Sequence, residues 1–209
     1  EKLKLPMAGT LPSGSVAALL RYDQRGLNIV LPEPINMSYV VDFESSRSAH
    51  RLRHRQRELL LRAVSGQTVC DLTCGFATDA FVLAASGMQV SAVEQNPIIF
   101  ELLQDAKLRL ENSNPELAAR ISFYNCTAEY WLEHNTYTYD NIYLDPMFPE
   151  RKKSAKVKKP AQILQFLNDD VPLTDWNSLP LFAHCKRVVI KPPLHAENLL
   201  QRKPTFTQA

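Results

Sequence analysis

The sequence lacks several patterns that mark large classes of protein. No apolar run in its 209 residues approaches the roughly 18–20 residues of a membrane-spanning helix, so we expect no membrane partner. It has neither the G-x-G-x-x-G fingerprint of dinucleotide-binding proteins nor the Gly-Lys-Ser/Thr signature of a phosphate loop. Internal repeats and low-complexity tracts are also absent. These absences disfavour a nicotinamide dehydrogenase and leave other ligands of an α/β protein open.

The sequence has few cysteines, and their spacing matches no paired motif. The four residues, Cys70, Cys74, Cys126 and Cys185, form no C-x-x-C pair, and their spacing does not suggest a zinc site. Three of them lie in or beside apolar runs that we interpret as strands. We therefore expect reduced thiols in the core of a cytoplasmic protein, and no metal.

What is present is an ordinary globular composition with an uneven charge. The apolar share of 45% suffices for a real core in one domain, or one domain with a small appendage. The net charge is only +2, yet six cations fall within 151–159 and five arginines within 47–57. Local basic patches favour a phosphate-bearing partner. The alternative is that each run is simply a solvated face.

The order of patterns predicts a doubly wound, mostly parallel α/β sheet with a small N-terminal β appendage. Residues 1–43 carry a hairpin signal, two short apolar runs around a glycine-containing turn, and one further strand at 38–43. Residues 44–209 then alternate strand and helix, which is typical of parallel sheets. In this second part strands are expected at 68–72, 89–94, 120–124, 139–145 and 186–191. Helices are expected at 44–65, 79–86, 97–111, 128–134 and 160–168.

Ligands of such sheets bind beyond the carboxyl ends of the strands, so residues at those positions are candidates for a site. The first strand is followed by a segment with Asp71, Gly75 and Asp79. Gly75 permits a tight turn close to a ligand. Acids suit a cationic ligand end better than a pyrophosphate, which favours the amino and sulfonium groups of S-adenosylmethionine (SAM) over a dinucleotide. The alternative role of Asp79 is to cap the helix.

Two further strand ends fit a nucleoside. Glu94 ends the second strand, where an acid can accept hydrogen bonds from both ribose hydroxyls. Thr127 and Ala128 follow the third strand, where backbone groups meet an adenine edge. Thr127 has an alternative role as the cap of the next helix.

The fourth strand end is the most unusual stretch, Asp145-Pro146-Met147-Phe148-Pro149. An exocyclic amine on a base is a poor nucleophile because its lone pair is delocalised into the ring. The Asp145 carboxylate, helped by the Pro146 carbonyl, can hold the amine N–H and relieve positive charge as the new bond forms. Phe148 offers a face on which the base stacks. The alternative is a rigid turn with a buried aromatic ring.

The stretch Tyr143-Leu144-Asp145-Pro146-Met147-Phe148-Pro149, followed by Lys153-Ser154-Ala155 and Val157-Lys158-Lys159, resembles the RsmJ (YhiQ) family of bacterial class I methyltransferases. Over roughly 16–193, three further blocks follow the order of that family: Val41-Asp42-Phe43 with Ala49-His50-Arg51; Asp71, Thr73, Gly75 and Asp79-Ala80-Phe81-Val82-Leu83-Ala84; and Lys186-Arg187-Val188-Val189.

The resemblance implies a class I methyltransferase, Rossmann-like, that uses SAM to methylate the N2 amine of one guanosine in 16S rRNA. By position, the cofactor contacts of the family would fall on Thr78, Asp79, Glu94, Gln95, Thr127, Ala128 and Asp145. This chain departs from the family where Ala77-Thr78 replaces Gly-Arg, Gln95 replaces Arg, and Thr127-Ala128 replaces a Ser pair.

These observations predict a SAM-dependent rRNA guanine-N2 methyltransferase whose partner is 16S rRNA or the small ribosomal subunit. Asp145, Pro146 and Phe148 would act on the base, and Asp71 and Gly75 would join the cofactor contacts. The residues expected to contact phosphates are Arg47, Arg51, Arg151, Lys152, Lys153, Lys156, Lys158 and Lys159. Open alternatives are adenine-N6 or protein-glutamine methylation, and a non-catalytic RNA-binding protein with the same fold.

Overall fold

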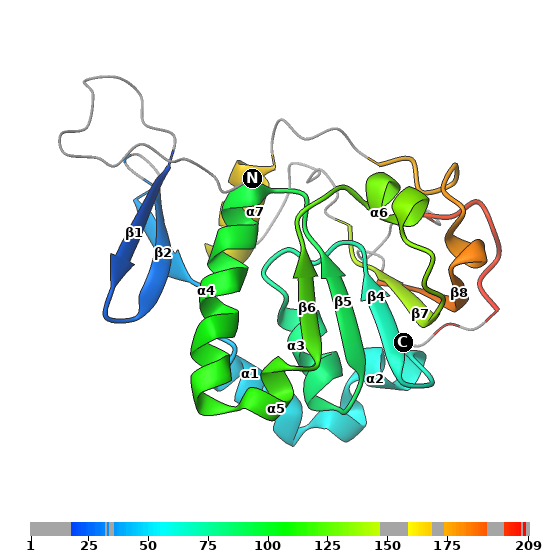
Figure 1. Ribbon diagram of the computed structural model, residues 1–209, viewed down its shortest axis with the longest axis horizontal. Helices are drawn as coiled ribbons and strands as arrows, with labels where there is room; N and C mark the ends of the chain where they lie inside the picture. The colour runs from blue at the N-terminus through cyan, green and yellow to red at the C-terminus, as the bar shows by residue number, and fades with distance from the viewer. Residues whose placement is uncertain are drawn as a thin grey trace.

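A five-stranded parallel sheet forms the centre of the protein (Figure 1). The computed structural model describes residues 18–31, 33, 36–146, 159–168, 174–191, 199–205 and 207. The strands lie in the order β6-β5-β4-β7-β8, and each neighbouring pair is parallel. Their bounds are β4 (Thr68–Asp71), β5 (Gln89–Val93), β6 (Ile121–Tyr124), β7 (Tyr139–Leu144) and β8 (Cys185–Ile190). The predicted doubly wound sheet is confirmed, and each of its strands lies within two residues of its predicted bounds.

The strand order fixes where a ligand can bind. From β4 the chain winds outward through β5 to β6, then returns to the other side of β4 for β7 and β8. The order therefore reverses between β4 and β7, and open α/β sheets bind ligands at the carboxyl ends of the strands that flank such a switch point. Asp71, the last residue of β4, pairs in register with Tyr143 of β7. Leu144 of β7 pairs with Ile190 of β8, so Asp145 and Lys191 follow side by side.

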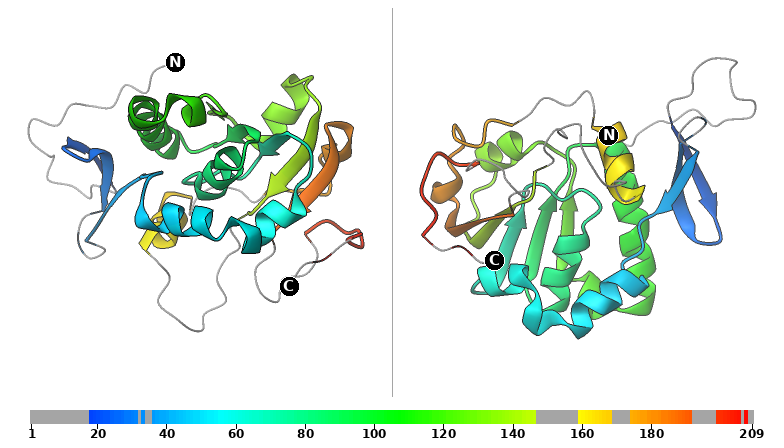
Figure 2. Two further views of the ribbon diagram at one scale, coloured as in Figure 1. Left: turned by 90° about the horizontal axis from the view of Figure 1, so that it is seen from below. Right: turned by 180° about the vertical axis from the view of Figure 1, so that it is seen from behind.

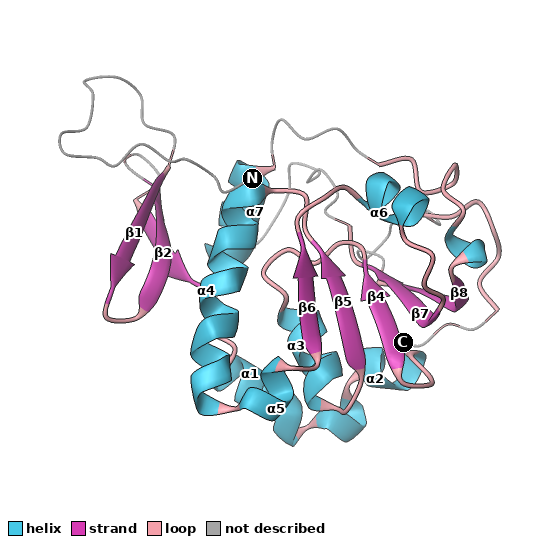
Figure 3. Ribbon diagram, viewed as in Figure 1, coloured by secondary structure: helices cyan, strands magenta, loops and turns pink. Residues whose placement is uncertain are grey.

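Side-chain alternation along the strands gives the sheet two apolar faces, and each is covered (Figures 2 and 3). On one face Val69 and Tyr143 join a core built mainly with α3 (Thr78–Ala85) and α4 (Pro97–Ser113). On the other, Cys70 and Ile142 pack with α6 (Ala128–His134) and residues 176–181. The remaining helices are α1 (Ser46–Arg53), η1 (Arg55–Arg57), α2 (Leu59–Ala63), α5 (Pro115–Ala118), α7 (Lys159–Leu167) and η2 (Leu181–Ala183). Within the described residues, no helix is both long and apolar enough to cross a membrane.

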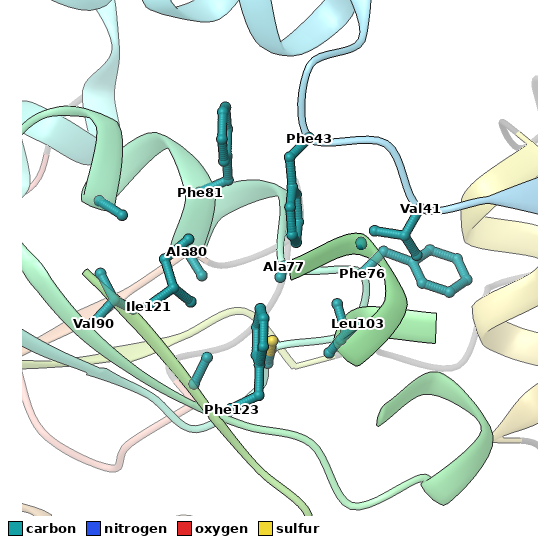
Figure 4. Packing of buried hydrophobic residues seen from close by; sticks show 14 of the residues in the cluster. Val41, Phe43, Phe76, Ala77, Ala80, Phe81, Val90, Leu103, Ile121 and Phe123 are labelled. Atoms are coloured by element: carbon teal, nitrogen blue, oxygen red, sulfur yellow. The ribbon is translucent and has the colours of Figure 1, made fainter. Parts of the chain in front are cut away.

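The N-terminal strands form a separate antiparallel sheet that shares the main core. Its order is β1 (Leu19–Asp23), β2 (Gly26–Leu31), β3 (Met37–Val40). Ile29 and Leu31 of β2 are fully buried in the same cluster as α4. After β3, the ring of Phe43 stacks on Phe81 of α3 at 5.3 Å between centroids and lies 6.2 Å from that of Phe123 of β6 (Figure 4). These contacts join the small sheet to the face of the large one.

One predicted helix is wrong, because it is not continuous. We expected a single helix over 44–65, but the structure divides it into α1, η1 and α2. The break before α2 falls at Glu58, whose φ of -69° and ψ of 112° are extended. In an unbroken helix residues 51 and 58 would lie roughly 10 Å apart along the axis. The break instead brings Glu58 against Arg51, with two hydrogen bonds of 2.9 and 2.8 Å.

The thiols agree with the expectation for the core. All four cysteines are free, and Cys70, Cys74 and Cys185 are buried. Burial raises the pKa of each of these three thiols, which keeps them protonated and unreactive.

Candidate active site

Acidic side chains converge at the carboxyl ends of the central strands. Asp71 ends β4, Glu94 follows β5, Asp145 follows β7, and Asp79 lies in the first turn of α3. Asp71 and Glu94 are almost completely buried, with 2% and 6% of their surface exposed. The structure thus brings together three of the predicted acids, Asp71, Asp79 and Asp145, which are close enough to perturb one another electrostatically. Such a concentration of buried acids needs compensation.

Asp71 and Asp145 are connected through Thr73. The Asp71 Oδ1 atom accepts hydrogen bonds from the Thr73 backbone N–H at 3.0 Å and from its hydroxyl at 3.3 Å. The same hydroxyl oxygen accepts the backbone N–H of Asp145 at 2.7 Å. Burial, assisted by the charges of Asp79 and Asp145, raises the pKa of Asp71 to about 8. Thr73 therefore fixes the start of the Asp145 turn relative to β4.

Glu94 organises the loop after β4. Its two carboxylate oxygens accept the backbone N–H groups of Gly75 and Asn96, each at 2.8 Å. Gly75 has φ of +53°, a left-handed conformation that favours glycine. Ala77 has a similar φ of +54°, at the position where the resemblance to the RsmJ family gives glycine. Burial raises the pKa of Glu94 to about 7, and an acid perturbed in this way is a candidate for binding or catalysis.

Asp79 is the centre of an ion-pair network. Its Oδ1 atom lies 2.6 Å from Arg51 Nη1, and its Oδ2 atom lies 2.9 Å from Lys191 Nζ. The Tyr143 hydroxyl donates a third hydrogen bond at 2.7 Å. Burial disfavours ionisation of Asp79, but these partners outweigh it and hold its pKa below the usual range. Lys191 Nζ also lies 2.6 Å from Asp145 Oδ2, so a continuous chain runs Glu58–Arg51–Asp79–Lys191–Asp145.

Asp145 itself is the acid at the switch point. Burial raises its pKa, and the Lys191 ammonium opposes that shift. Pro146 follows and is half-buried. The partner predicted to stack on a base, Phe148, lies outside the described residues, as do Arg151, Lys152, Lys153, Lys156 and Lys158.

The other predicted cofactor residues surround the same strand ends. Thr78 begins α3 beside Asp79, and Gln95 is exposed directly after Glu94. Thr127 caps α6 by accepting the Tyr130 N–H at 3.2 Å, which is its alternative predicted role, and Ala128 is buried at the first position of that helix. On α7, Leu164 lies close to Gly75, and Leu167 accepts a hydrogen bond from Asn96 at 2.8 Å.

The residues expected to contact phosphate differ in their surroundings. Arg51 is committed to Glu58 and Asp79, with only 17% of its side chain exposed. Lys159 is exposed at the first residue of α7, while the side chain of Arg47 is outside the described part. Arg53, Arg55 and Arg57 are exposed. Figure 1 places α1 and α2 near the amino ends of β4 to β6, and the Arg51 side chain nevertheless reaches Asp79 of the acidic site.

Sequence reasoning missed four members of the site: Thr73, Tyr143, Glu58 and Lys191. Thr73 had a local signal, because a hydroxyl two residues after an acid commonly closes a turn. Lys191 also had one, since it directly follows the apolar strand that neighbours the Asp145 strand. Glu58 and Tyr143 had no local sequence signal, because their partners lie 7 and 64 residues away in the chain.

A doubly wound parallel sheet whose strand ends present acids in place of a glycine-rich phosphate loop has the architecture of a class I methyltransferase. The family described as "Putative SAM-dependent methyltransferase" matches residues 8–209. A solved SAM-dependent methyltransferase from Neisseria gonorrhoeae superimposes with a TM-score of 0.70 at 25% identity, covering 95% of this chain and 80% of that one.

Curated relatives share more sequence. Ribosomal RNA small subunit methyltransferase J of Alteromonas mediterranea is 39% identical over 177 residues, which are 79% of this chain and 68% of the relative. The protein of the same name from Haemophilus influenzae is 37% identical over 205 residues, 93% and 80% of the two chains. This chain belongs to the family of SAM-dependent methyltransferases that contains ribosomal RNA small subunit methyltransferase J.

The residues present fit the cofactor of this family. Glu94 is a buried acid at the end of β5, suited to ribose hydroxyls, and Gly75 leaves the loop beside it without a side chain. Asp79, in the first turn of α3, lies beside the same loop and carries a carboxylate. Thr127 and Ala128 begin α6 next to these strands.

The ion-pair network makes a prediction for Arg51. Replacing Arg51 with Met leaves the half-buried acids Glu58 and Asp79 short of a partner. We expect the free energy of unfolding to fall by about 2 kcal/mol, less than the roughly 3–5 kcal/mol of fully buried pairs because some solvent reaches this one. Urea denaturation measures this change. Arg53→Met, on the exposed part of the same helix, is the control and should change stability little; a stable Arg51→Met protein with weakened RNA binding would instead support the phosphate-contact role.

Glu94 makes a prediction for pH dependence. Its folded pKa of about 7 lies above the ordinary value of 4.5, so the folded state holds this proton more tightly than the unfolded state. Stability from this group is therefore complete at low pH and is lost as the pH rises from about 4 to 8, by about 3 kcal/mol. Glu94→Gln should reduce this decline, measured as the free energy of unfolding at several pH values without ligand. An unchanged slope would show that Glu94 is ionised in the folded protein throughout.

Proposed function

We propose that this protein transfers the methyl group of SAM to the N2 amine of a guanosine in small-subunit ribosomal RNA. Two facts support the rRNA substrate: the names of the curated relatives and the membership of the chain in their family. The observation that carries the reaction type is the Asp145 carboxylate, which follows β7 at the switch point of the sheet and lies beside Asp79. Work on ribosomal RNA would place the protein in the cytoplasm.

The chemistry requires an acceptor for an aromatic amine. Bound SAM supplies a methyl group activated by its sulfonium. As the amine nitrogen forms a new bond it gains positive charge, and a carboxylate that holds its N–H stabilises that charge. The backbone of Asp145 is fixed by Thr73 and its side chain by Lys191, so this acceptor is positioned before substrate arrives. Preorganisation of this kind contributes through orientation as well as charge.

The cofactor would be held by residues at the neighbouring strand ends. Glu94 would accept the ribose hydroxyls, and Asp79 would face the amino acid portion, with Gly75 allowing close approach. Asp71 would support this loop through Thr73. Thr78, Gln95, Thr127 and Ala128 complete the proposed contacts.

The target base has to leave its stack to reach Asp145. Phe148 would receive it on its ring, at a gain of roughly 1–3 kcal/mol. The basic run 151–159 follows Phe148 in the chain and ends at Lys159, which is exposed on α7. Leu164 of α7 lies close to Gly75, so the helix that Lys159 begins contacts the loop after β4, which supports a phosphate contact for Lys159 near the site.

Asp145 provides the central test. Asp145→Asn keeps the shape but removes the charge, and we expect methyl transfer to fall by at least about 100-fold while SAM affinity stays within about threefold. Transfer of labelled methyl groups to rRNA gives the rate, and calorimetry gives the affinity. Parallel assays with DNA and protein, together with mass spectrometry of the modified rRNA, identify the substrate atom. Wild-type rates in Asp145→Asn, or a product other than N2-methylguanosine, would contradict the proposal.

The two basic runs give a second test. Replacing the six cations of 151–159 with Gln should weaken RNA binding and make log affinity depend less steeply on log salt, by roughly 0.7–0.9 for each phosphate that the variant no longer neutralises. The comparison variant replaces the exposed Arg53, Arg55 and Arg57 with Gln and should have the smaller effect for each charge removed. Filter binding over a salt series measures both. A larger effect of the arginine variant would place the RNA on α1 and η1 instead.

A further inference from the structure

Two lysine–aspartate pairs join β8 to β7, one at each end. Lys186 Nζ lies 2.8 Å from Asp140 at the amino end, where its side chain is 77% exposed. Lys191 Nζ lies 2.6 Å from Asp145 just past the carboxyl end. The two pairs have the same chemistry and the same strands, but only the second is in the acidic site. They therefore form a natural comparison.

Lys191 is held by both backbone and side chain. Its N–H donates to the Leu144 carbonyl at 2.9 Å, which continues the β7–β8 ladder by one bond and places the two residues side by side. Its ammonium bridges Asp145 Oδ2 and Asp79 Oδ2. Lys191 thus links Asp145, the acid proposed to hold the substrate amine, with Asp79, an acid proposed to contact the cofactor.

We propose that Lys191 is a positioning residue for methyl transfer, which keeps Asp145 ionised and aimed at the substrate amine. The inference rests on the proposed role of Asp145. A carboxylate accepts about four hydrogen bonds, so the bond to Lys191 leaves capacity for the N–H of a base. A protonated Asp145 would offer fewer acceptors and less negative charge.

The charges around Asp145 explain why this cation is needed. Asp79 of α3 acts on it as a like charge, and the Tyr143 hydroxyl of β7 is bound to Asp79. Asp71 of β4 also faces it, but burial raises the pKa of Asp71 to about 8, so this group is mostly protonated at neutral pH. Among the described residues, the charge of Arg51 of α1 also lowers the pKa of Asp145. Without Lys191, burial and the charge of Asp79 would be opposed less, and the pKa of Asp145 would rise.

Lys191 itself is not suited to act as a base. Burial alone would lower its pKa, but Asp79 and Asp145 outweigh burial and raise it. The ammonium therefore stays protonated at neutral pH, and its contribution comes from charge and hydrogen bonding.

The test compares Lys191→Met, Lys191→Arg and Lys186→Met in the full chain. For Lys191→Met we expect the acid limb of the kcat–pH profile to move up by about one pH unit, so that activity recovers as the pH rises. Lys191→Arg should restore the wild-type midpoint, because it keeps a cation between the two acids. Lys186→Met should leave the profile unchanged. A uniform loss of kcat at all pH values, with the midpoint unmoved, would overturn the inference.

A second measurement needs no turnover. In the ligand-free protein, Lys191→Met should lose more stability than wild type between pH 5 and 8, because a folded-state acid with a raised pKa is destabilising once ionised. Adding Asp145→Asn to Lys191→Met should remove that extra loss. If the double variant keeps the extra loss, Lys191 does not set the protonation of Asp145, and the inference is wrong. If the double variant removes the extra loss, but the wild-type protein methylates no rRNA, the coupling of Lys191 to Asp145 stands and the proposed function fails.

Discussion

The accumulation of carboxyl groups at one edge of the sheet is the constraint on which the rest of the structure depends. The parallel order brings the ends of β4, β5 and β7 together, and each end supplies an acid. Like charges in a region of low dielectric repel strongly unless cations or hydrogen-bond donors offset them. The break at Glu58 and the backbone register that places Lys191 next to Asp145 both serve this compensation.

The acids are compensated in two different ways. Asp79 and Asp145 are bound to cations and lie in one ion-pair chain. Asp71 and Glu94 instead accept hydrogen bonds from backbone N–H groups and the Thr73 hydroxyl, and burial raises the pKa of each. The first pair is held by ion pairs, and the second pair by hydroxyl and amide donors.

The sequence predicted the sheet well because each strand combines an apolar run with a turn or helix signal. The acids could be placed at one edge from chain order alone, since parallel strands share their carboxyl ends. The sequence could not show which lysine and arginine side chains would pair with these acids. Arg51 and Arg53 are two residues apart on one helix, yet Arg51 is half-buried against carboxylates and Arg53 is exposed. That difference arises from tertiary packing. The break at Glu58 also arises from tertiary packing, and the helical spacing of residues in 44–65 gave no sign of it.

The same distinction explains why a basic run is a poor guide to RNA contacts. A phosphate and a buried carboxylate attract the same guanidinium, and the carboxylate prevails where the fold brings it close with good geometry. Arg51 therefore stabilises the site through an internal ion pair, because it holds Asp79 beside Lys191. A phosphate partner must be sought among cations that have solvent exposure and lie near the strand ends. Lys159 on α7 is exposed, and Leu164 of the same helix lies close to Gly75 in the loop that leads from β4 to Asp79.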